Sequence, residues 1–585
     1  MPLGGFTVEQ LEEELSDFSC KFDGEQEFVD KMNALSHAFH IDSEDLINET
    51  MGYAMNMKRT DLDVGFLDAF EAHYKKKNAP SAVSKSKPRA VLADLKPTTA
   101  GTPRRTTKLN ISAMEIDDEL DMTLPRLDCS DAPPHVKEFV IVDSPAGPGW
   151  FVARADSSKV VSSLGGDVAR ERRTKKPMSV TVKPLAKQQR QVYGEPKAAG
   201  VLEGMNARLE AYGEDVRAAN AVTMADAPYV SLVRETESPV FIIGFVAAFD
   251  ARVADMSTVE LERDEAEGAV AVTVDVSALD ERCFFPGQMA VFQGTNRAGN
   301  LFEATARLTA DRQPCATVSR GDEDAVVWVA AGPFTPPSAA SYEPLAEIVE
   351  RARQEQPDVL VLVGPLVDRQ SKFLVSKACT VNEDQMMHEL LKRIALKMKG
   401  CPTTRVLFMP SSARDGCAIP VYPGAGLREE WKDEVVELVS DPLLLVVGGG
   451  AEVAITASDI VTHLSRAESY SSSNKENTDR MKRVAGHMLE QRSLYPLYPP
   501  SLAASLEGIH TACTLSGKQP HVIVAPSMLT AFAKSAYGSV IVNPGSACKG
   551  ASVGTLMKMR IGLTEIPDAG TANLERYTHV SITKI

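Results

Sequence analysis

The first 78 residues carry apolar side chains at helical spacing. The members of each stripe lie three or four residues apart, which places them on one face of an α-helix. Two of these stripes are Phe28, Met32, Leu35 and Phe39, and Phe66, Leu67, Phe70 and Tyr74. We therefore expect residues 1–78 to form an all-α helical domain, and its outer surface is a candidate for docking other proteins.

The apolar periodicity fades over residues 79–190, where Ser, Thr, Pro, Lys and Arg dominate. Such a segment cannot bury enough apolar surface to offset the entropy of ordering it, so we expect a flexible basic linker. Thr102 is followed by Pro103 and two arginines, which makes it the candidate phospho-acceptor of a proline-directed kinase; an accidental match is the alternative. Residues 170–176, Arg-Glu-Arg-Arg-Thr-Lys-Lys, are either a nuclear-import or phosphate-contact patch or simply solvated linker.

Residues 191–324 are predicted to start with a helix over 199–211 and to continue as short strands. A strand-like run over 240–249 carries a glycine where a small barrel would bend, and further strands are predicted over 269–275 and 289–292. We expect an OB-type β-barrel. Such barrels bind single strands through aromatic platforms and a basic groove, but the acidic residues of this segment favour a structural role over direct DNA binding.

Residues 325–585 alternate buried strands with amphipathic helices, a pattern typical of an α/β fold. The predicted strands are the apolar runs at 325–331, 357–363, 406–409, 443–447, 522–524 and 539–542. The predicted helices are 342–354 and 384–398. Gly, Pro or Ser closely follows each strand, and in open α/β sheets a functional site lies outside the carboxyl ends of the strands.

Net charge, cysteine spacing and the length of the apolar runs argue against several classes of protein. The formal net charge of -16 excludes a protein whose whole surface binds nucleic acid. The 9 cysteines include no C-x-x-C pair, which argues against a zinc ribbon or a disulfide framework. Apolar runs are only as long as strands, and residues 1–6 lack the pattern of a secretory signal, so we expect neither a membrane span nor secretion.

The loops after the predicted strands lack the ligands of a two-metal site. The order of strands and helices resembles a calcineurin-like phosphoesterase, which places Asp, His and Asn there as D-x-H, G-D-x-x-D, G-N-H and G-H-x-H. In this chain the loops read Ala-Gly-Pro-Phe at 331–334, Gly-Pro-Leu-Val-Asp at 364–368, Met-Pro-Ser-Ser-Ala-Arg-Asp at 409–415 and Val-Ala-Pro-Ser-Met-Leu at 524–529. We therefore expect a catalytically inactive phosphoesterase fold with no catalytic residue, metal or cofactor.

Four polar residues in this region need a separate interpretation. Asp368 and Asp415 lie in Gly- and Pro-rich loops, and we expect them to accept backbone hydrogen bonds that hold the loops in shape. His510 and His521 have no carboxylate at ligand spacing, so we expect packed or solvated side chains rather than a residual metal site.

Several motifs resemble those of the B subunits of replicative DNA polymerases, which join an OB-type domain to an inactive phosphoesterase domain. They are Phe-Phe-Pro-Gly-Gln at 284–288, Ala-Gly-Pro-Phe-Thr at 331–335, Gln-Arg-Ser-Leu-Tyr-Pro-Leu-Tyr-Pro-Pro at 491–500 and Val-Asn-Pro-Gly at 542–545. The run at 491–500 narrows the resemblance to B subunits of the DNA polymerase alpha–primase complex, because the delta and epsilon types lack it. Ser546 departs from the family pattern, which has Arg after N-P-G.

The resemblance implies a nuclear, non-catalytic accessory subunit that supports the initiation of DNA replication. The implied partners are the C-terminal zinc-binding domain of the catalytic polymerase subunit, the primase subunits through it, and other replication factors at the helical domain, with weak or indirect contact to DNA. Three alternatives stay open: a metal-dependent phosphoesterase with a displaced site, the B subunit of another replicative polymerase, and a single-strand DNA-binding module that uses the barrel.

Overall fold

The structure is a computed structural model in which the chain forms two units, 1–115 and 116–585, described here one at a time. In the first unit it describes residues 21–22, 25–39, 46, 50 and 61–77. In the second it describes 139, 151, 154, 156–166, 168, 176–184 and 198–585, the last range with gaps at 226, 250–256, 266–267, 377–378, 380, 425–426, 428–430, 432, 473–478 and 516. Thr102 and the basic residues 170–175 lie outside the described residues.

The described part of the first unit contains two helices that contact each other, α2 (Glu25–Phe39) and α4 (Val64–Lys77). Phe28, Phe66 and Phe70 of the two predicted stripes are buried. Lys31 of α2 lies between two carboxylates of α4, with its Nζ 2.8 Å from Asp68 and 2.6 Å from Glu71. Short strands β1 (Lys21–Phe22) and β2 (Asp61–Leu62) pair in parallel.

A closed five-stranded barrel, in the order β10-β7-β6-β5-β9, confirms the barrel predicted from the sequence. Its strands are β5 (Thr236–Val246), β6 (Thr258–Glu265), β7 (Gly268–Asp275), β9 (Met289–Asn296) and β10 (Leu301–Leu308). Gly244 allows the predicted bend, because a Cβ there would lie 2.8 Å from the carbonyl oxygen of Glu262. Helix α7 (Ala198–Ala219) extends beyond the predicted 199–211 and packs against β5 and β9.

A seven-stranded sheet in the order β14-β13-β12-β11-β23-β24-β3 forms the first half of the α/β region. Its members are β11 (Ala325–Ala331), β12 (Val359–Val363), β13 (Arg405–Met409), β14 (Val436–Leu438), β23 (Thr555–Ile561), β24 (Thr578–Lys584) and β3 (Val160–Leu164). Strands β11 to β14 run parallel, whereas β23, β24 and β3 join by antiparallel pairing.

A six-stranded sheet in the order β19-β20-β18-β16-β15-β4 forms the second half. Its members are β19 (Phe532–Ala536), β20 (Ser539–Asn543), β18 (Val522–Val524), β16 (Ala451–Ile455), β15 (Leu443–Val447) and β4 (Val180–Pro184). Strands β16, β18 and β20 run parallel to one another.

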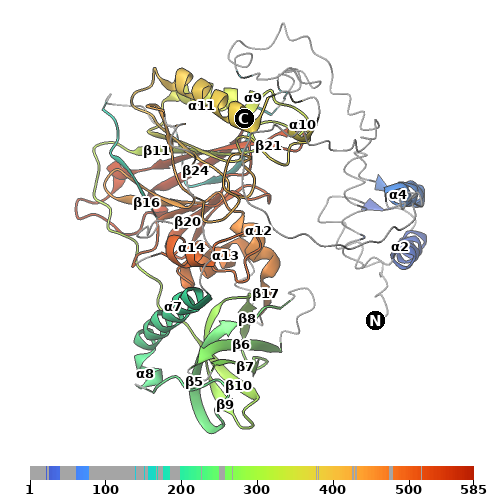
Figure 1. The fold of residues 1–585 in the computed structure, drawn as a ribbon, viewed down its shortest axis with the longest axis vertical. Coiled ribbons are helices and arrows are strands. Elements are labelled where there is room, and N and C mark those ends of the chain that lie inside the picture. The colour runs from blue at the N-terminus through green and yellow to red at the C-terminus, as the bar shows by residue number, and fades with distance from the viewer. Residues whose placement is uncertain are drawn as a thin grey trace, which may run out of the picture. The chain divides into compact units, whose positions relative to one another are not determined.

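The two sheets bury their apolar faces against each other. One cluster contains Val327 and Val361 from the first sheet and Val453 and Val542 from the second. Helices α9 (Glu343–Glu355) and α11 (Glu383–Met398) cover the outer face of the seven-stranded sheet, and α12 (Ile460–Ala467), α13 (Arg480–Glu490) and α14 (Leu506–Ala512) cover that of the six-stranded sheet, as Figure 1 shows. The arrangement is a four-layer sandwich whose central layers are both sheets. No helix among the described residues combines the length and apolar character needed to cross a bilayer.

The prediction that 79–190 is a flexible linker is wrong for two segments, which form strands β3 and β4. Strand β3 pairs with β24 at one end of the first sheet, and β4 pairs with β15 at one end of the second. Phe139 and Phe151 are also buried against the outer core of the seven-stranded sheet. A strand at the end of a sheet needs only one neighbour and one apolar face, so five-residue segments among basic residues carry little signal in sequence.

A chain that starts at residue 191, the predicted boundary, should therefore be less stable than one that starts at 135. The shorter chain loses β3 and β4 and leaves β24 and β15 with unpaired backbone groups, which template aggregation. We expect a lower unfolding temperature and more light scattering on heating. Equal unfolding temperatures by circular dichroism would show that the two strands contribute nothing.

Candidate functional site at the carboxyl ends of the strands

The parallel strands of the two sheets end at a shared edge, where their loops are hydrogen-bonded to one another. The amide of Ala547, in the loop after β20, donates to the carbonyl oxygen of Ala331 at the end of β11, at 2.7 Å. A Cβ at Gly332 would lie 2.0 Å from the carbonyl oxygen of Pro365. The loops after β11 and β12 therefore leave no space for a side chain at position 332.

Asp415 is buried at this edge with both carboxylate oxygens engaged. Its Oδ1 accepts the amides of Leu366 and Val367 at 2.6 and 3.1 Å, and its Oδ2 accepts the amide of Ser411 at 2.7 Å. Gly364 is required beside it, because a Cβ there would lie 2.0 Å from Oδ2. Burial raises the pKa of Asp415 to about 7, and the backbone hydrogen bonds oppose that shift.

Asp368 lies in the loop after β12 and pairs with a cation of the protein. Its Oδ2 accepts a hydrogen bond from Nη2 of Arg414 at 2.5 Å, and its Oδ1 accepts the amide of Gln370 at 3.1 Å. The prediction that both aspartates accept backbone hydrogen bonds is confirmed, and the Arg414 pair was not predicted. These contacts connect the loops after β12 and β13.

The two histidines contact residues from distant parts of the chain, which agrees with the prediction of packed side chains. His510 Nδ1 lies 2.9 Å from Arg208 Nη1, and burial followed by the charge of Arg208 lowers the pKa of His510 to about 3. His521 Nδ1 accepts the amide of Glu452 at 3.0 Å, while its Nε2 lies 2.8 Å from the carbonyl oxygen of Ala316. Neither ring belongs to a cluster of metal-ligating groups among the described residues.

A buried polar cluster that the sequence analysis missed lies between the barrel and the sandwich. Oε1 of Glu468 lies 3.3 Å from the Cys283 sulfur and 3.0 Å from His487 Nε2. Arg483 donates to both oxygens of Glu468, through Nε at 3.1 Å and Nη2 at 3.0 Å. Arg483 and His487 both lie on α13 and Glu468 is 15 residues before Arg483, but Cys283 is 185 residues from Glu468, so no local pattern reveals the whole cluster.

Charge within this cluster is balanced by the protein itself. Burial raises the pKa of the Cys283 thiol and favours its protonated form. Burial also acts to raise the pKa of Glu468, but hydrogen bonds from His487 and Arg483 outweigh it and hold that pKa at about 2. Cys, Glu and His are zinc ligands, yet Arg483 already neutralises the carboxylate and would oppose a divalent ion.

Two motifs singled out in the sequence, 284–288 and 491–500, meet at the junction between the barrel and the sandwich. The side chain of Gln491 accepts the amide of Met289 at 2.7 Å and donates to its carbonyl oxygen at 3.1 Å. The amide of Tyr498 donates to the carbonyl oxygen of Pro286 at 3.1 Å. Gly287 has a φ of 83°, and a Cβ there would lie 2.5 Å from that of Tyr498, so glycine is required on both counts.

Further contacts fasten the same junction. Strand β8 (Glu281–Phe284) pairs antiparallel with β17 (Ser469–Ser472), which joins the barrel region to the sandwich. Oε1 of Glu490 accepts hydrogen bonds from Arg307 of β10 at 2.5 Å and from the Tyr212 hydroxyl of α7 at 3.2 Å. Barrel and sandwich are therefore fastened to each other by several contacts within one compact unit.

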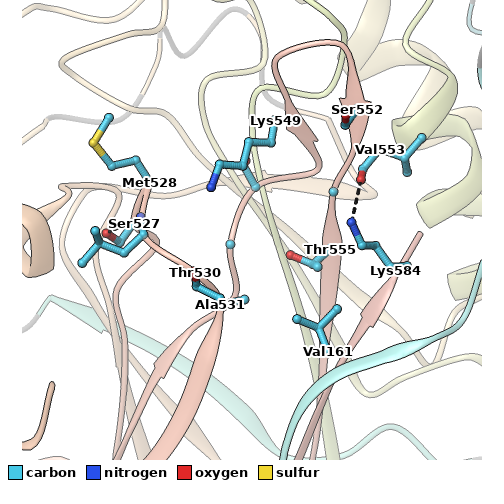
Figure 2. A pocket seen from close by; sticks show the side chains of 14 residues that line it. Val161, Ser527, Met528, Thr530, Ala531, Lys549, Ser552, Val553, Thr555 and Lys584 are labelled. Atoms are coloured by element: carbon cyan, nitrogen blue, oxygen red, sulfur yellow. Dashed lines mark hydrogen bonds between the residues drawn. The ribbon is translucent and has the colours of Figure 1, made fainter. Parts of the chain in front are cut away.

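A pocket of about 360 Å³ opens where the loops after β18 and β20 approach β3 and the end of β24. Its lining combines apolar side chains with two lysines, as Figure 2 shows. Lys549 extends toward the loop that carries Met528, and Lys584 Nζ lies 3.4 Å from the carbonyl oxygen of Val553.

Comparison with known proteins agrees with this architecture. Residues 202–309, which include the barrel, match the family model for the OB domain of the DNA polymerase alpha B subunit, and 327–534 match the model for the B subunits of DNA polymerases alpha and epsilon. Residues 9–77 match the model for the N-terminal part of the DNA polymerase alpha B subunit. The chain is 26% identical to the DNA polymerase alpha B subunit of Caenorhabditis elegans over 99% of both chains. It is 30% identical to that of Mus musculus over 62% of this chain and 60% of the mouse protein, and 31% identical to that of Rattus norvegicus over 57% and 56%.

The barrel and the mixed α/β sandwich lie in the regions that match family models of DNA polymerase B subunits, so the chain falls in that class of protein. The three family models match in chain order, and the curated relatives share one name. The chain belongs to the family of DNA polymerase alpha B subunits.

Replacing Glu468 with Gln should destabilise the fold, by about 3 kcal/mol at neutral pH, because it leaves Arg483 buried without a carboxylate. The folded-state pKa of Glu468, about 2, lies below the ordinary value of 4.5, so its stabilisation is complete above pH 4.5 and is lost as the pH falls toward 2. The difference in free energy of unfolding between wild type and Glu468→Gln, measured in urea, should therefore shrink over that range.

The matched control is Glu355→Gln, which removes an ion pair with Lys558 from a carboxylate that is 51% exposed. Its cost should be at most about 1 kcal/mol, because water screens an exposed pair. A Glu468→Gln effect as small as that of the control, or one that does not change with pH, contradicts the assignment.

Proposed function

We propose that the chain is a non-catalytic accessory subunit of DNA polymerase alpha–primase that acts as a scaffold during RNA-DNA primer synthesis at the initiation of replication. Family membership supports the accessory role. The observation that carries the absence of catalysis is Asp415, whose two oxygens accept three backbone amides at the edge where an α/β enzyme would present its ligands.

The α/β region is, in this proposal, a calcineurin-like phosphoesterase fold that has lost its metal site. Two central sheets with helices on both outer faces support that assignment. Pro365 stands where the family has its bridging aspartate, and Asp368 is paired with Arg414. Two divalent ions need several anionic or imidazole ligands that converge on one point. The two carboxylates at this edge, Asp368 and Asp415, are already engaged by Arg414 and by backbone amides.

The proposed domains follow the predicted boundaries with one revision. Residues 1–78 form the helical docking domain, 191–324 the OB-type domain and 325–585 the inactive phosphoesterase-like domain. The linker over 79–190 contributes β3 and β4 to the two sheets before the chain enters α7.

The hydrogen-bonded junction between barrel and sandwich suits a surface that binds a partner through both parts. The proposed partner is the C-terminal zinc-binding domain of the catalytic polymerase subunit, which in turn links the primase subunits. A fixed relative orientation of the two parts, held by contacts such as Gln491 to Met289, lowers the entropy cost of binding across both. The helical domain recruits further replication factors, and the chain works in the nucleus.

The charge of the barrel favours this scaffold role over recognition of single strands. Exposed Glu260, Glu262 and Asp264 follow one another along one face of β6. Phosphates would be repelled there, whereas single-strand binders line their grooves with cations. Contact with DNA is therefore weak or indirect in this proposal.

The purified full-length chain should show no hydrolysis of a model phosphodiester with added Mn²⁺, and an Asp368→Asn variant should give the same background. Metal analysis of the same samples should return no stoichiometric divalent metal. Metal-dependent turnover that Asp368→Asn abolishes would instead support the displaced-site phosphoesterase.

Co-expression with the C-terminal domain of a candidate catalytic subunit should yield a complex on size-exclusion chromatography. Gln491→Ala removes two hydrogen bonds across the junction, so we expect about 2 kcal/mol lower stability and a reduced co-eluting fraction. Glu260→Ala on the outer face of β6 is the control and should leave the complex intact. Failure of the unmodified chain to form any complex refutes the scaffold proposal.

A further inference from the structure

The pocket beside Lys549 and Lys584 has the chemistry of a peptide-binding site. Its apolar side includes Val161, Met528 and Leu529, which are 40%, 61% and 36% exposed. Exposed apolar side chains gathered at a hollow mark interaction sites more often than single ones scattered over a surface do.

The two lysines give the pocket a positive charge that the protein does not neutralise. Among the described residues neither Lys549 nor Lys584 forms an ion pair, whereas Lys534 and Lys558 pair with Asp479 and Glu355. The chain as a whole has 79 acidic and 63 basic residues, so a hollow lined by two lysines and no carboxylate has the opposite sign of charge to the whole chain. Their charges are available to an acidic ligand.

The geometry favours an extended ligand. Val161 belongs to β3, the terminal strand of the seven-stranded sheet, which among the described residues pairs with β24 and also contacts β19 of the six-stranded sheet. Hydroxyl groups of Thr530, Ser546 and Ser552 lie along the same lining. An extended peptide presents alternate side chains to opposite sides, so it can place apolar groups on Met528 and acidic groups near the lysines.

One segment of the chain has the matching composition. Residues 116–124 read Ile-Asp-Asp-Glu-Leu-Asp-Met-Thr-Leu, four acidic and four apolar residues, and they lie outside the described residues. The chain is anchored after them at Phe139, which belongs to the same buried cluster as Cys548 and Ile585, the sequence neighbours of the two lysines. The roughly 15 residues from 124 to 139 can span about 50 Å when extended.

We propose that this pocket binds residues 116–124 of the same chain. The complementary charges set the orientation, and the apolar side chains of the segment cover Met528 and Leu529. The inference does not rest on the proposed function, because the contact lies within one chain and requires no polymerase subunit.

A photo-reactive residue in place of Met528 in the full-length chain tests the contact. We expect mass spectrometry to find cross-links to 116–124, in the same chain when isotopically heavy and light proteins are mixed. A photo-reactive residue in place of Leu396, which is 73% exposed on α11, should not give them. Cross-links that go elsewhere, or that join heavy to light chains, overturn the proposal.

A second measurement uses a fluorescent peptide of sequence 116–124. It should bind a full-length chain in which Asp117, Asp118, Glu119 and Asp121 are changed to Ser about tenfold more tightly than it binds wild type, where the internal segment competes. Lys549→Glu in that chain should weaken the peptide about tenfold, and Lys392→Glu on α11, with the same change of charge, should not. Equal affinities across these variants overturn the proposal even if all of them fold.

Discussion

The buried carboxylate of Glu468 is the interaction on which the arrangement of this protein depends. It draws a strand of the barrel region, through Cys283, and a helix of the sandwich, through Arg483 and His487, to one point away from water. A buried carboxylate is costly unless it is paired and hydrogen-bonded, so the segments that satisfy it cannot separate without exposing an unpaired charge. The side chain of Gln491 holds the same junction through hydrogen bonds to the main-chain amide and carbonyl groups of Met289.

The same physical rule explains the carboxyl ends of the strands. A carboxylate at that edge can bind a metal or can accept hydrogen bonds from its own loops, and Asp415 does the second with both oxygens. Gly364 leaves the space that this arrangement requires, and Gly332 lets the loop after β11 approach Pro365. The loops at this edge are held to one another by hydrogen bonds to Asp415 and by close backbone approaches, which supports the proposal of a surface that keeps its shape while a partner binds.

Most of the regular structure could be predicted from the sequence, because each prediction rested on a local pattern. The strand over 325–331 is continuous and apolar, since both of its faces are buried, and the structure has it over the same residues. The sequence over 269–275 alternates and the structure has strand β7 there, and Gly244 of β5 stands at the predicted bend. Strands β3 and β4 were missed because each lies at the end of a sheet, where one neighbour supplies the pairing and little apolar surface is needed.

By itself the sequence determined the family, the order of the parts and the absence of phosphoesterase ligand motifs from the loops that follow the strands. Each of these can be recognised from runs of adjacent residues, such as 491–500. Only the tertiary structure decided which distant residues share a site: Cys283 with Glu468, Arg307 with Glu490, and the two lysines of the pocket with Met528. The reason is that periodicity and spacing depend on residues that are neighbours along the chain. These contacts form only when the sheets and the barrel pack, because packing brings together segments that are far apart in sequence.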